Sequence, residues 1–331
     1  MSEYFDSLTL RRIRRIFTKL MLVKSNELST ATIEYDSSWA NITGEEFQKY
    51  LIEMIQSGKP FMLSRFGCGV LGTAIDYKLS VSPKTIFKYI FGKIDSIDLQ
   101  RHNINNLCNN DGFYPPLRKD IMQYGHLIYN TFDELDVFAT IMKQERFFQK
   151  ELSFKKRCRF HDLEPFHFNN PWTSALKGKK VLVIHPFTNS IKYQYENNRD
   201  KIFENKNCLP EFKLILLRAV QSKLISEAPY DQYDSWFDAY KFLCEEIKKI
   251  DFDIAILGCG AYGMPLAAYV KRLGKQAIHI GGAVQYLFGI RSARADVSNP
   301  DVVSFYNDYW IRPVVEDRPT GYLKIEDGCY W

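Results

Sequence analysis

A glycine-rich turn between two strand-like runs is the first segment of this sequence that can do chemistry. Residues 252–282 read FDIAILGCGAYGMPLAAYVKRLGKQAIHIGG, with Gly258, Gly260 and Gly263 in the turn. Glycines at such a turn let the backbone approach a ligand, and the helix that follows offers free N–H groups to an anion. The segment predicts a βαβ unit that binds a phosphate-bearing ligand; the alternative is that the glycines serve tight packing alone.

The same glycine spacing occurs in dinucleotide-binding turns. Such a site requires an Asp or Glu about 20 residues further on, which holds a ribose hydroxyl. No acidic residue lies between Asp253 and Asp296, and the second strand runs into His279, Ile280, Gly281 and Gly282. A phosphate-bearing ligand other than NAD is therefore the favoured interpretation.

A second corner follows an earlier strand-like run. In SRFGCGVL, residues 64–71, the strand brings Arg65 to its end, and Gly67 and Gly69 open the turn. The planar guanidinium can donate two parallel hydrogen bonds to a diphosphate. The alternative is a surface arginine beside an ordinary turn.

A histidine stands at the end of a third strand-like run, VLVIHPFTNSI at residues 181–191. Open α/β sheets bind ligands at the carboxyl ends of their strands, so His185 is a candidate general base or a hydrogen-bond donor to phosphate. The alternative is a structural histidine. Asp251 and Asp253 have DxD spacing but lie at the opposite end of their strand. His161 and His167 lack the i, i+4 relation of helical metal ligands, which argues against a metal site there.

Strand-like and helix-like segments alternate along the chain, which predicts an α/β fold with a mostly parallel, Rossmann-like sheet flanked by helices. Residues 133–170 are ambiguous, with a helical stretch near 141–152. The predicted strands are 60–66, 179–185, 212–217, 252–257 and 276–280. The predicted helices are 45–56, 94–108, 117–131, 190–205, 236–250 and 265–273.

Composition and charge exclude several classes of protein. The chain has 331 residues, of which 46% are hydrophobic and 25% charged, so it is neither disordered nor collagenous, and no apolar run is long enough to span a bilayer. The net charge of +5 is concentrated in residues 1–24, which argues against a general nucleic-acid-binding surface. Seven scattered cysteines without a CxxC pair, and no signal peptide, favour a reduced cytoplasmic protein.

The basic N-terminus has the pattern of an amphipathic helix. Leu10, Ile13, Phe17 and Leu20 fall on one face of residues 8–23, and arginines occupy the rest. Such a helix either lies on an anionic membrane surface or packs on its own domain. A polar linker follows at 25–40, so the predicted organisation is a helix and linker over 1–40 and one domain over 41–331.

Several of these segments together resemble a bacterial family from surface-polysaccharide gene clusters that is similar to GT-D type glycosyltransferases. The resemblance covers residues 45–331 and is carried by RFG-x-G, VLVIHPF, DFDIAILGCGAYGMPLA, GKQAIHIGGAVQYLFGI and the terminal EDGCYW. It implies a single GT-D-like domain that transfers a sugar from a nucleotide-sugar donor to a capsular or exopolysaccharide glycan, free or lipid-linked, on the inner face of the plasma membrane. The alternative is a non-catalytic or nucleotide-binding assembly component.

The resemblance also implies roles for individual residues. GT-D enzymes typically carry RFGDGE at the first corner, where the two acids bind Mn²⁺ or Mg²⁺; here Cys68 and Val70 stand in their places, and neither replaces an oxygen ligand. The residues expected to bind the nucleotide and diphosphate are Arg65, Gly67, Gly69, Gly258, Gly260, Tyr262, Gly263, Gly281 and Gly282. Those expected to shape the sugar and acceptor site are Gln285, Tyr286 and Trp331.

Two further expectations concern geometry. The candidates for the base that deprotonates the acceptor hydroxyl are His185 and Glu326. Trp331 is expected to dock back onto the domain. The donor pocket itself requires the corners at 65–69 and 258–263 to meet at the tips of adjacent strands and hold a pyrophosphate between them.

Overall fold

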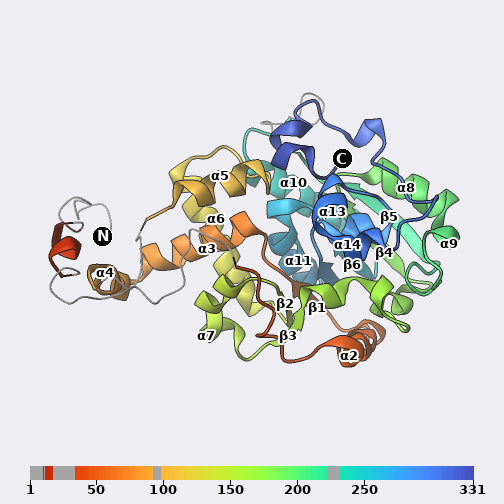
Figure 1. Ribbon diagram of the computed structural model, residues 1–331, viewed down its shortest axis with the longest axis horizontal. Coiled ribbons are helices and arrows are strands. Elements are labelled where there is room, and N and C mark those ends of the chain that lie inside the picture. The colour runs from red at the N-terminus through yellow and green to blue at the C-terminus, as the bar shows by residue number, and fades with distance from the viewer. Residues whose placement is uncertain (1–9, 11, 18–33, 92–97, 222–231) are drawn as a thin grey trace.

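One seven-stranded sheet forms the centre of the protein (Figure 1). The computed structural model describes residues 10, 12–17, 34–91, 98–221 and 232–331. The strand order is β3-β2-β1-β7-β6-β4-β5, and every neighbouring pair is parallel, which confirms the predicted α/β fold. The strands are β1 (Phe61–Ser64), β2 (Val137–Thr140), β3 (Lys156–Arg159), β4 (Lys180–His185), β5 (Lys213–Arg218), β6 (Ile254–Leu257) and β7 (Gln276–His279).

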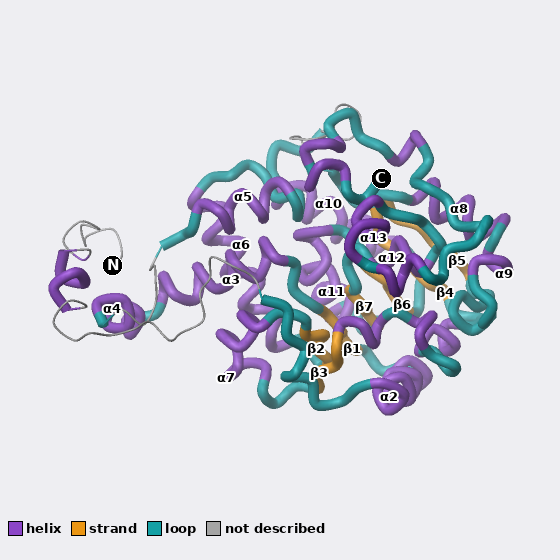
Figure 2. The backbone as a smooth tube through the Cα atoms, in the orientation of Figure 1, coloured by secondary structure: helices purple, strands orange, loops and turns teal. Residues whose placement is uncertain are grey.

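Helices cover both faces of this sheet (Figure 2). One face packs against α3 (Cys68–Val81), α5 (Arg101–Asn109), α6 (Arg118–Asn130), α10 (Trp236–Lys249) and α11 (Gly263–Arg272). The other packs against α2 (Gly44–Gln56), α8 (Thr188–Asn197), α9 (Arg199–Ile202), α12 (Ala283–Leu287), α13 (Ala293–Ser298) and α14 (Pro300–Val303). Strand β4 shows the consequence: Leu182 and Ile184 enter the first core, and Val181 and Val183 the second. A strand buried on both sides reads as a continuous apolar run.

The chain changes direction across the sheet at β4 and β6. From β4 the chain adds β5 at the outer edge, and from β6 it adds β7 on the opposite side. The carboxyl ends of β4 and β6 therefore flank a topological switch point, where open α/β sheets bind their ligands. His185 ends β4, and Gly258 follows β6 directly.

Two strands and five of the described helices are not among the predicted elements: β2, β3, α3, α4 (Pro83–Ile90), α12, α13 and α14. β2 and β3 lie in the stretch 133–170 that the sequence leaves ambiguous. β3 reads KRCR, with exposed ends and a buried centre, so it carries no apolar run. Helix α3 begins at Cys68, inside the segment expected to be a turn, and its residues 69–76 are all buried. A helix buried on every side shows no amphipathic period.

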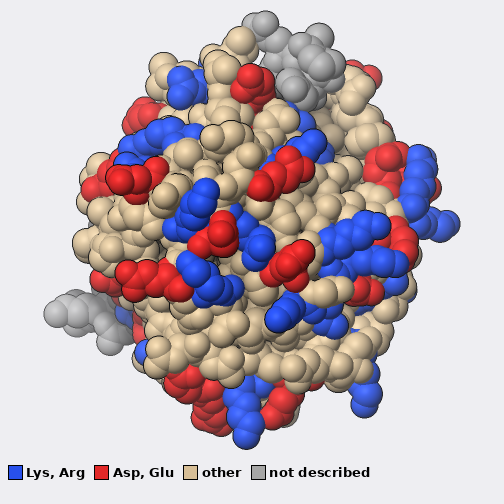
Figure 3. All heavy atoms as spheres, turned by 90° about the vertical axis from the view of Figure 1, so that its right-hand side faces the viewer, with Lys and Arg blue, Asp and Glu red and all other residues tan. Residues whose placement is uncertain are grey.

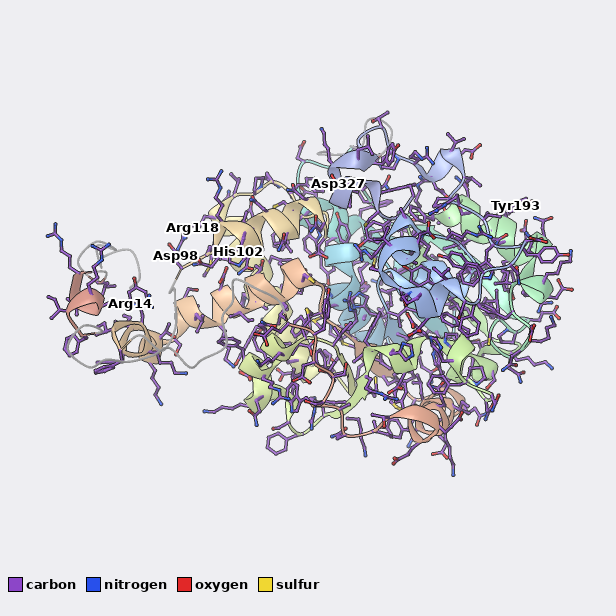
Figure 4. All side chains as sticks on the ribbon, viewed as in Figure 1. Arg14, Asp98, His102, Arg118, Tyr193 and Asp327 are labelled. Carbon is purple, nitrogen blue, oxygen red and sulfur yellow. The ribbon has the colours of Figure 1, made fainter. Side chains whose placement is uncertain are left out.

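Residues 10 and 12–17 and helix α4 (Pro83–Ile90) form an arm that projects from the body (Figures 1 and 4). Leu10 is buried in a small cluster with Tyr89, Phe17 packs edge-on against Phe91, and Arg14, labelled in Figure 4, lies over the Tyr89 ring. The apolar side of residues 10 and 12–17 thus packs within the chain. Leu20 and most of the linker at 25–40 lie outside the described residues.

Acidic and basic side chains are interspersed on the face seen in Figure 3, where neither sign forms a continuous field. In the body, Arg118 at the start of α6 pairs with Asp98 across 2.5 Å (Figure 4). Within the described ranges, no helix is both long enough and apolar enough to cross a bilayer.

Candidate functional site

A pocket opens at the carboxyl edge of the sheet, above the ends of β1, β4, β5, β6 and β7. It contains about 980 Å³ of space not filled by atoms, including the solvent at its open mouth. Both glycine corners line it, through Arg65 and Gly67 on one side and Gly258 and Gly260 on the other. The corners therefore lie at the same end of the sheet. The expectation that they follow adjacent strands is wrong, because β7 lies between β1 and β6.

The pocket brings together most of the residues singled out in the sequence. Its lining includes Arg65, Gly67, His185, Gly258, Gly260, Tyr262, Gly281, Gly282 and Trp331. Gly69, Gly263, Gln285 and Tyr286 are not part of that lining. Cys68 and Val70 also lie off the lining: Val70 is buried in the core, and the Cys68 thiol lies 3.9 Å from the sulfur of Met142. The side chain of Glu326 is outside the described part of the chain.

Gln285 and Tyr286 are instead held in the structure around the pocket. The buried amide of Gln285 donates hydrogen bonds to the carbonyls of Arg291 and Tyr330. The hydroxyl of Tyr286 shares a hydrogen bond of 2.8 Å with Ser292 Oγ. Both polar groups are occupied by the chain itself, so neither side chain is available to a sugar in this conformation.

The loop after α5 joins the two corners through one residue, Asp111. The carbonyl of Asp111 accepts a hydrogen bond of 2.8 Å from the Ala261 N–H, in the second corner. Its carboxylate faces the first corner: a Cβ at Gly67 would lie 2.7 Å from Oδ1, and one at Gly69 would lie 2.4 Å from Oδ2. Asp111 thus sits between the corners and fixes their separation.

The corner glycines serve first to let these loops approach one another. Gly260 has φ +56°, and a Cβ there would lie 2.4 Å from the Asp111 carbonyl oxygen. A Cβ at Gly258 would meet the Gly281 carbonyl at 2.5 Å, and one at Gly263 would meet Nε2 of His279 at 2.1 Å. No larger side chain fits at these positions without displacing the backbone or a buried ring. Tight packing is therefore part of the reason for the glycines.

Asp111 is the carboxylate that the structure brings to the first corner. Burial raises the pKa of its carboxyl to about 6, and the N–H groups of Gly69 and Val70 and the charge of Arg65 act in the opposite direction. Its Oδ2 is shielded from solvent, and no donor in the described residues completes a hydrogen bond to it. The carboxylate of Asp76, another acid in the N-terminal part of the chain, already accepts hydrogen bonds from the Gln100 N–H and the side-chain amide of Asn103.

These residues do not fit the two-carboxylate metal motif of GT-D enzymes. A hard cation needs several oxygen ligands, and the positions of the motif hold a thiol and an isopropyl group. Asp111 alone supplies one carboxylate, which already faces the helix amides and an arginine. Among the described residues, Arg65 is the one lysine or arginine in the pocket lining.

Arg65 projects into the pocket from the end of β1. Its guanidinium lies 5.0 Å from the centre of the Phe160 ring, and Nη1 lies 3.0 Å from where a Cβ of Gly281 would stand. The Nε is buried without a hydrogen-bond partner, and no carboxylate of the described residues is within ion-pair distance. The nearby Glu145 does not neutralise it, because burial raises the pKa of that carboxyl to about 8. The charge of Arg65 is available to an anion.

His185 presents a proton to the pocket rather than a lone pair. The backbone N–H of Phe187 donates a hydrogen bond of 2.9 Å to Nδ1 of His185, so the proton of the neutral ring is on Nε2. Burial lowers the pKa of the ring to about 3, so it stays neutral at physiological pH. The side chain can donate a hydrogen bond to a phosphate oxygen, and this geometry argues against its use as a base.

The end of β7 holds a second buried histidine on the pocket wall. Nδ1 of His279 lies 2.8 Å from Ser64 Oγ, and burial together with Arg65 lowers the pKa of the ring to about 3. This is the strand end at which a dinucleotide site would carry its ribose-binding acid. A neutral imidazole tied to Ser64 cannot replace that acid.

The C-terminal segment closes one wall of the pocket. The Trp331 ring is 9% exposed, packs at 5.4 Å against Phe187, and donates from Nε1 to the Asp317 carbonyl. The expectation that Trp331 docks on the domain is confirmed. Tyr330 lines the pocket beside it, under the guanidinium of Arg294 at 4.6 Å from the ring centre.

Asp111 and His279 are among the pocket residues that are not in the predicted site. Asp111 lies in NNDG, which reads as an ordinary turn, and its contact with both corners depends on long-range packing. The signal available in the sequence was an acidic residue in the loop that follows the predicted helix 94–108. For His279 the signal was its place at the carboxyl end of a buried strand, the same argument that selected His185.

Comparison with known proteins adds no identification. No protein-family model, curated protein or solved structure matches the chain.

Proposed function

We propose that this protein is a glycosyltransferase that binds a nucleotide-sugar donor in the pocket and transfers the sugar to a cell-surface glycan, capsular or exopolysaccharide, or to its lipid-linked precursor. The observation that carries the proposal is the Arg65 guanidinium, which forms no ion pair with the described residues, in a pocket built from two glycine corners at the switch point of a parallel sheet. The resemblance of residues 45–331 to GT-D type enzymes supports the same class.

Charge and hydrogen-bond donors in the pocket match a diphosphate. Arg65 offers a planar cation with parallel N–H donors. The His185 ring is neutral at pH 7, so it offers a single N–H donor whose presence does not depend on pH in that range. Negative charge grows on the diphosphate as the sugar bond breaks, so donors fixed in advance at that oxygen lower the barrier. Arg65 and His185 would stabilise the leaving diphosphate and take no proton from the acceptor.

The aromatic wall of Phe187, Tyr330 and Trp331 offers flat apolar surfaces beside these donors. Sugars and bases both stack on such rings. Under this proposal the wall holds the base or the sugar ring, with Gly281 and Gly282 leaving room near Tyr330. Carbohydrate specificity then depends on the C-terminal segment rather than on Gln285 and Tyr286.

The direct test is calorimetric titration of the full chain with a panel of nucleoside diphosphates and nucleotide sugars, with and without Mn²⁺. We expect one ligand to bind without added metal and to be hydrolysed slowly or transferred when an acceptor glycan is present. Absence of binding to every nucleotide sugar, with and without Mn²⁺, would reject the proposal. Arg65→Lys is the matched variant: it keeps the charge and removes the planar fork.

A non-catalytic role in polysaccharide assembly is the alternative, and one observation favours it: this chain lacks both acids of the GT-D metal motif, with Cys68 and Val70 in their places. This alternative predicts that Arg65→Ala leaves glycan production intact while removal of residues 1–24 abolishes it. The glycosyltransferase proposal predicts loss of glycan with Arg65→Ala.

An NAD(P)-dependent oxidoreductase is a third possibility and rests on the glycine spacing alone. The strand end that would carry the ribose-binding acid holds His279. NADH added to the protein is expected to show no change in fluorescence; an increase would favour this class.

The projecting arm is the place for peripheral contact with the cytoplasmic face of a membrane. Phe87 is 65% exposed and Ile16 58% exposed, near Arg12, Arg15 and Lys84. Basic residues around exposed apolar side chains suit an anionic lipid surface. The full chain should then float with anionic liposomes at low salt and dissociate at high salt, and Phe87→Ser should weaken flotation; equal behaviour of the variant would contradict the contact.

A further inference from the structure

Two histidines and a glutamate meet beyond the end of β3, away from the pocket lining. Nδ1 of His161 lies 3.1 Å from Oε2 of Glu164, and Nε2 of His167 lies 3.2 Å from the same oxygen. The three candidate ligand atoms all lie within 4.8 Å of one another. The two imidazoles are neighbours as well, with ring centres 4.1 Å apart.

The backbone explains why residues three apart come together. His161 lies in η4 (Phe160–Leu163) and His167 in η5 (Pro165–His167), two consecutive 3₁₀ turns joined at Glu164. Glu164, which lies between the two turns, has an extended backbone (φ −84°, ψ 102°), so the chain bends there and the imidazoles on either side both reach its carboxylate. The sequence argument against a metal site considered the α-helical i, i+4 spacing alone and did not anticipate that these side chains converge.

Burial and access differ among the three groups in a way that suits an ion. Glu164 is 4% exposed, so a buried carboxylate is fixed in place, whereas half of the His161 side chain is open to solvent. The rings of Phe166 and Phe305 pack against His167 at 4.7 and 5.3 Å and hold its orientation. A buried carboxylate needs a compensating positive charge, which a cation provides directly. The exposed imidazole is the route by which an ion enters.

The distances agree with ligation by a small divalent ion. Zn²⁺ bonds imidazole nitrogen and carboxylate oxygen at about 2.0–2.1 Å, so two ligands of a tetrahedral site lie about 3.3 Å apart. The two nitrogen–oxygen distances here are 3.1 and 3.2 Å. We propose that His161, Glu164 and His167 bind one divalent transition-metal ion of the Zn²⁺ or Co²⁺ type. Two imidazoles and one carboxylate leave further positions for water, and this nitrogen-rich set favours such ions over Mg²⁺.

This site is separate from the residues of the proposed function. None of the three ligands lines the pocket, and none belongs to the first corner or to the loop that carries Asp111. The two places are linked by sequence only at Phe160, whose ring contacts Arg65 and which precedes His161. The inference therefore stands whether or not the pocket binds a nucleotide sugar.

The test is calorimetric titration of the full-length, chelator-treated protein with Zn²⁺ and with Co²⁺. We expect one ion per chain in the wild type. His161→Ala should weaken binding by about tenfold or more, since even the loss of an outer partner of a ligand typically has that effect. His126→Ala is the matched control, because His126 is exposed on α6 and remote in sequence, and should bind as the wild type does.

The Co²⁺ spectrum separates this site from the seven cysteines. Ligation by nitrogen and oxygen should give visible d–d bands without a thiolate charge-transfer band in the near ultraviolet, and His161→Ala should remove the visible bands. His161 is half exposed, so this variant is expected to fold, which circular dichroism verifies; Glu164→Gln is the second variant. Wild-type protein that binds no ion, variants that bind as the wild type does, or a thiolate band would each overturn the proposal and leave a hydrogen-bonded His–Glu–His cluster only.

Discussion

The two glycine corners lie at the same edge of the sheet and line the same pocket, but they differ in charge. The corner after β1 carries Arg65 and faces the Asp111 carboxylate, so ionised groups concentrate there. The corner after β6 is surrounded by neutral groups, among them His185 and His279, both with pKa values lowered to about 3 by burial. Similar glycine spacing thus serves two purposes: the first corner carries the charged groups of the pocket, and the second forms an uncharged part of its wall.

The comparison also shows how the corners depend on each other. The second corner keeps its place through Asp111, whose backbone carbonyl it contacts and whose side chain faces the first corner. A change at either glycine turn should therefore be felt at the other through the 109–112 loop. Substitutions at Gly260, Arg65 and Asp111, with matched controls, separate packing from charge in this arrangement.

Gly260→Ala should have the largest effect, on the free energy of unfolding. The φ of +56° strains an alanine, and its Cβ would lie 2.4 Å from the Asp111 carbonyl. Left-handed backbone costs roughly 1–2 kcal/mol and overpacking about 1–3 kcal/mol, which together give a loss of about 2–5 kcal/mol. Denaturant unfolding measures it.

The matched control is Gly274→Ala, at φ +78° with nothing within 4 Å of the added Cβ. It has the backbone strain without the contact and should lose only about 1–2 kcal/mol. Equal losses for the two variants would mean that the second corner does not depend on the Asp111 loop.

Arg65→Ala should have the next largest effect, on ligand affinity rather than on stability. The guanidinium has no ion pair in the described residues, so the fold depends little on its charge, whereas a diphosphate would lose a charge-assisted contact. Such a contact contributes about 2 kcal/mol, roughly a 30-fold change in the dissociation constant of a nucleoside diphosphate. Calorimetry measures it, and Arg65→Lys should recover part of the loss. Unchanged affinity would show that the Arg65 charge at the first corner does not contribute to ligand binding.

How much of this could be read from the sequence depends on the range of the interactions involved. The buried strands β1, β4, β5, β6 and β7 are apolar runs, and their alternation with helices was enough to predict a parallel sheet. β3 carries charges at both ends and escaped this argument. Arg65, His185 and the glycines were found because strand ends are recognisable locally.

The remainder of the site depends on contacts between distant segments. Asp111 is 44 residues from Gly67 and 149 from Gly260, and nothing in NNDG announces either contact. Gln285 and Tyr286 follow a promising IGG segment, but their polar groups are taken up by Tyr330, Arg291 and Ser292, which only the fold brings near. Local patterns therefore identified the corners, and the groups that connect or satisfy them were not predictable.

Asp111→Asn should have a smaller, pH-dependent effect on stability. The pKa of the carboxyl is raised from 3.8 to about 6, so the folded state holds the proton more tightly than the unfolded state does. Stability attributable to this group is therefore present below pH 3.8 and lost as the pH rises through 6. Asparagine has no such loss, so the variant should be more stable than the wild type at pH 7.5 and similar at pH 4.

The size of that difference is on the order of 1 kcal/mol, because the residue is half-buried and solvent screens part of the shift. Denaturant unfolding of both proteins at the two pH values measures it. A variant that is less stable at pH 7.5 would show that the carboxylate is needed at the first corner as an acceptor for the Gly69 and Val70 amides.

The smallest expected effect concerns His185, whose imidazole we expect to keep the same protonation state between pH 8 and 5. Its Nδ1 accepts from the Phe187 N–H, and burial keeps the pKa of the ring near 3. Between pH 8 and 5 the nitrogen resonances of this imidazole should stay those of the neutral Nε2–H form. In the same spectra of metal-free protein His161 should titrate above the ordinary value of 6.5, because Glu164 raises the pKa of its ring. A titration of His185 near 6.5 would mean that the ring can take a proton, and the second corner would then contain a base as well as a donor.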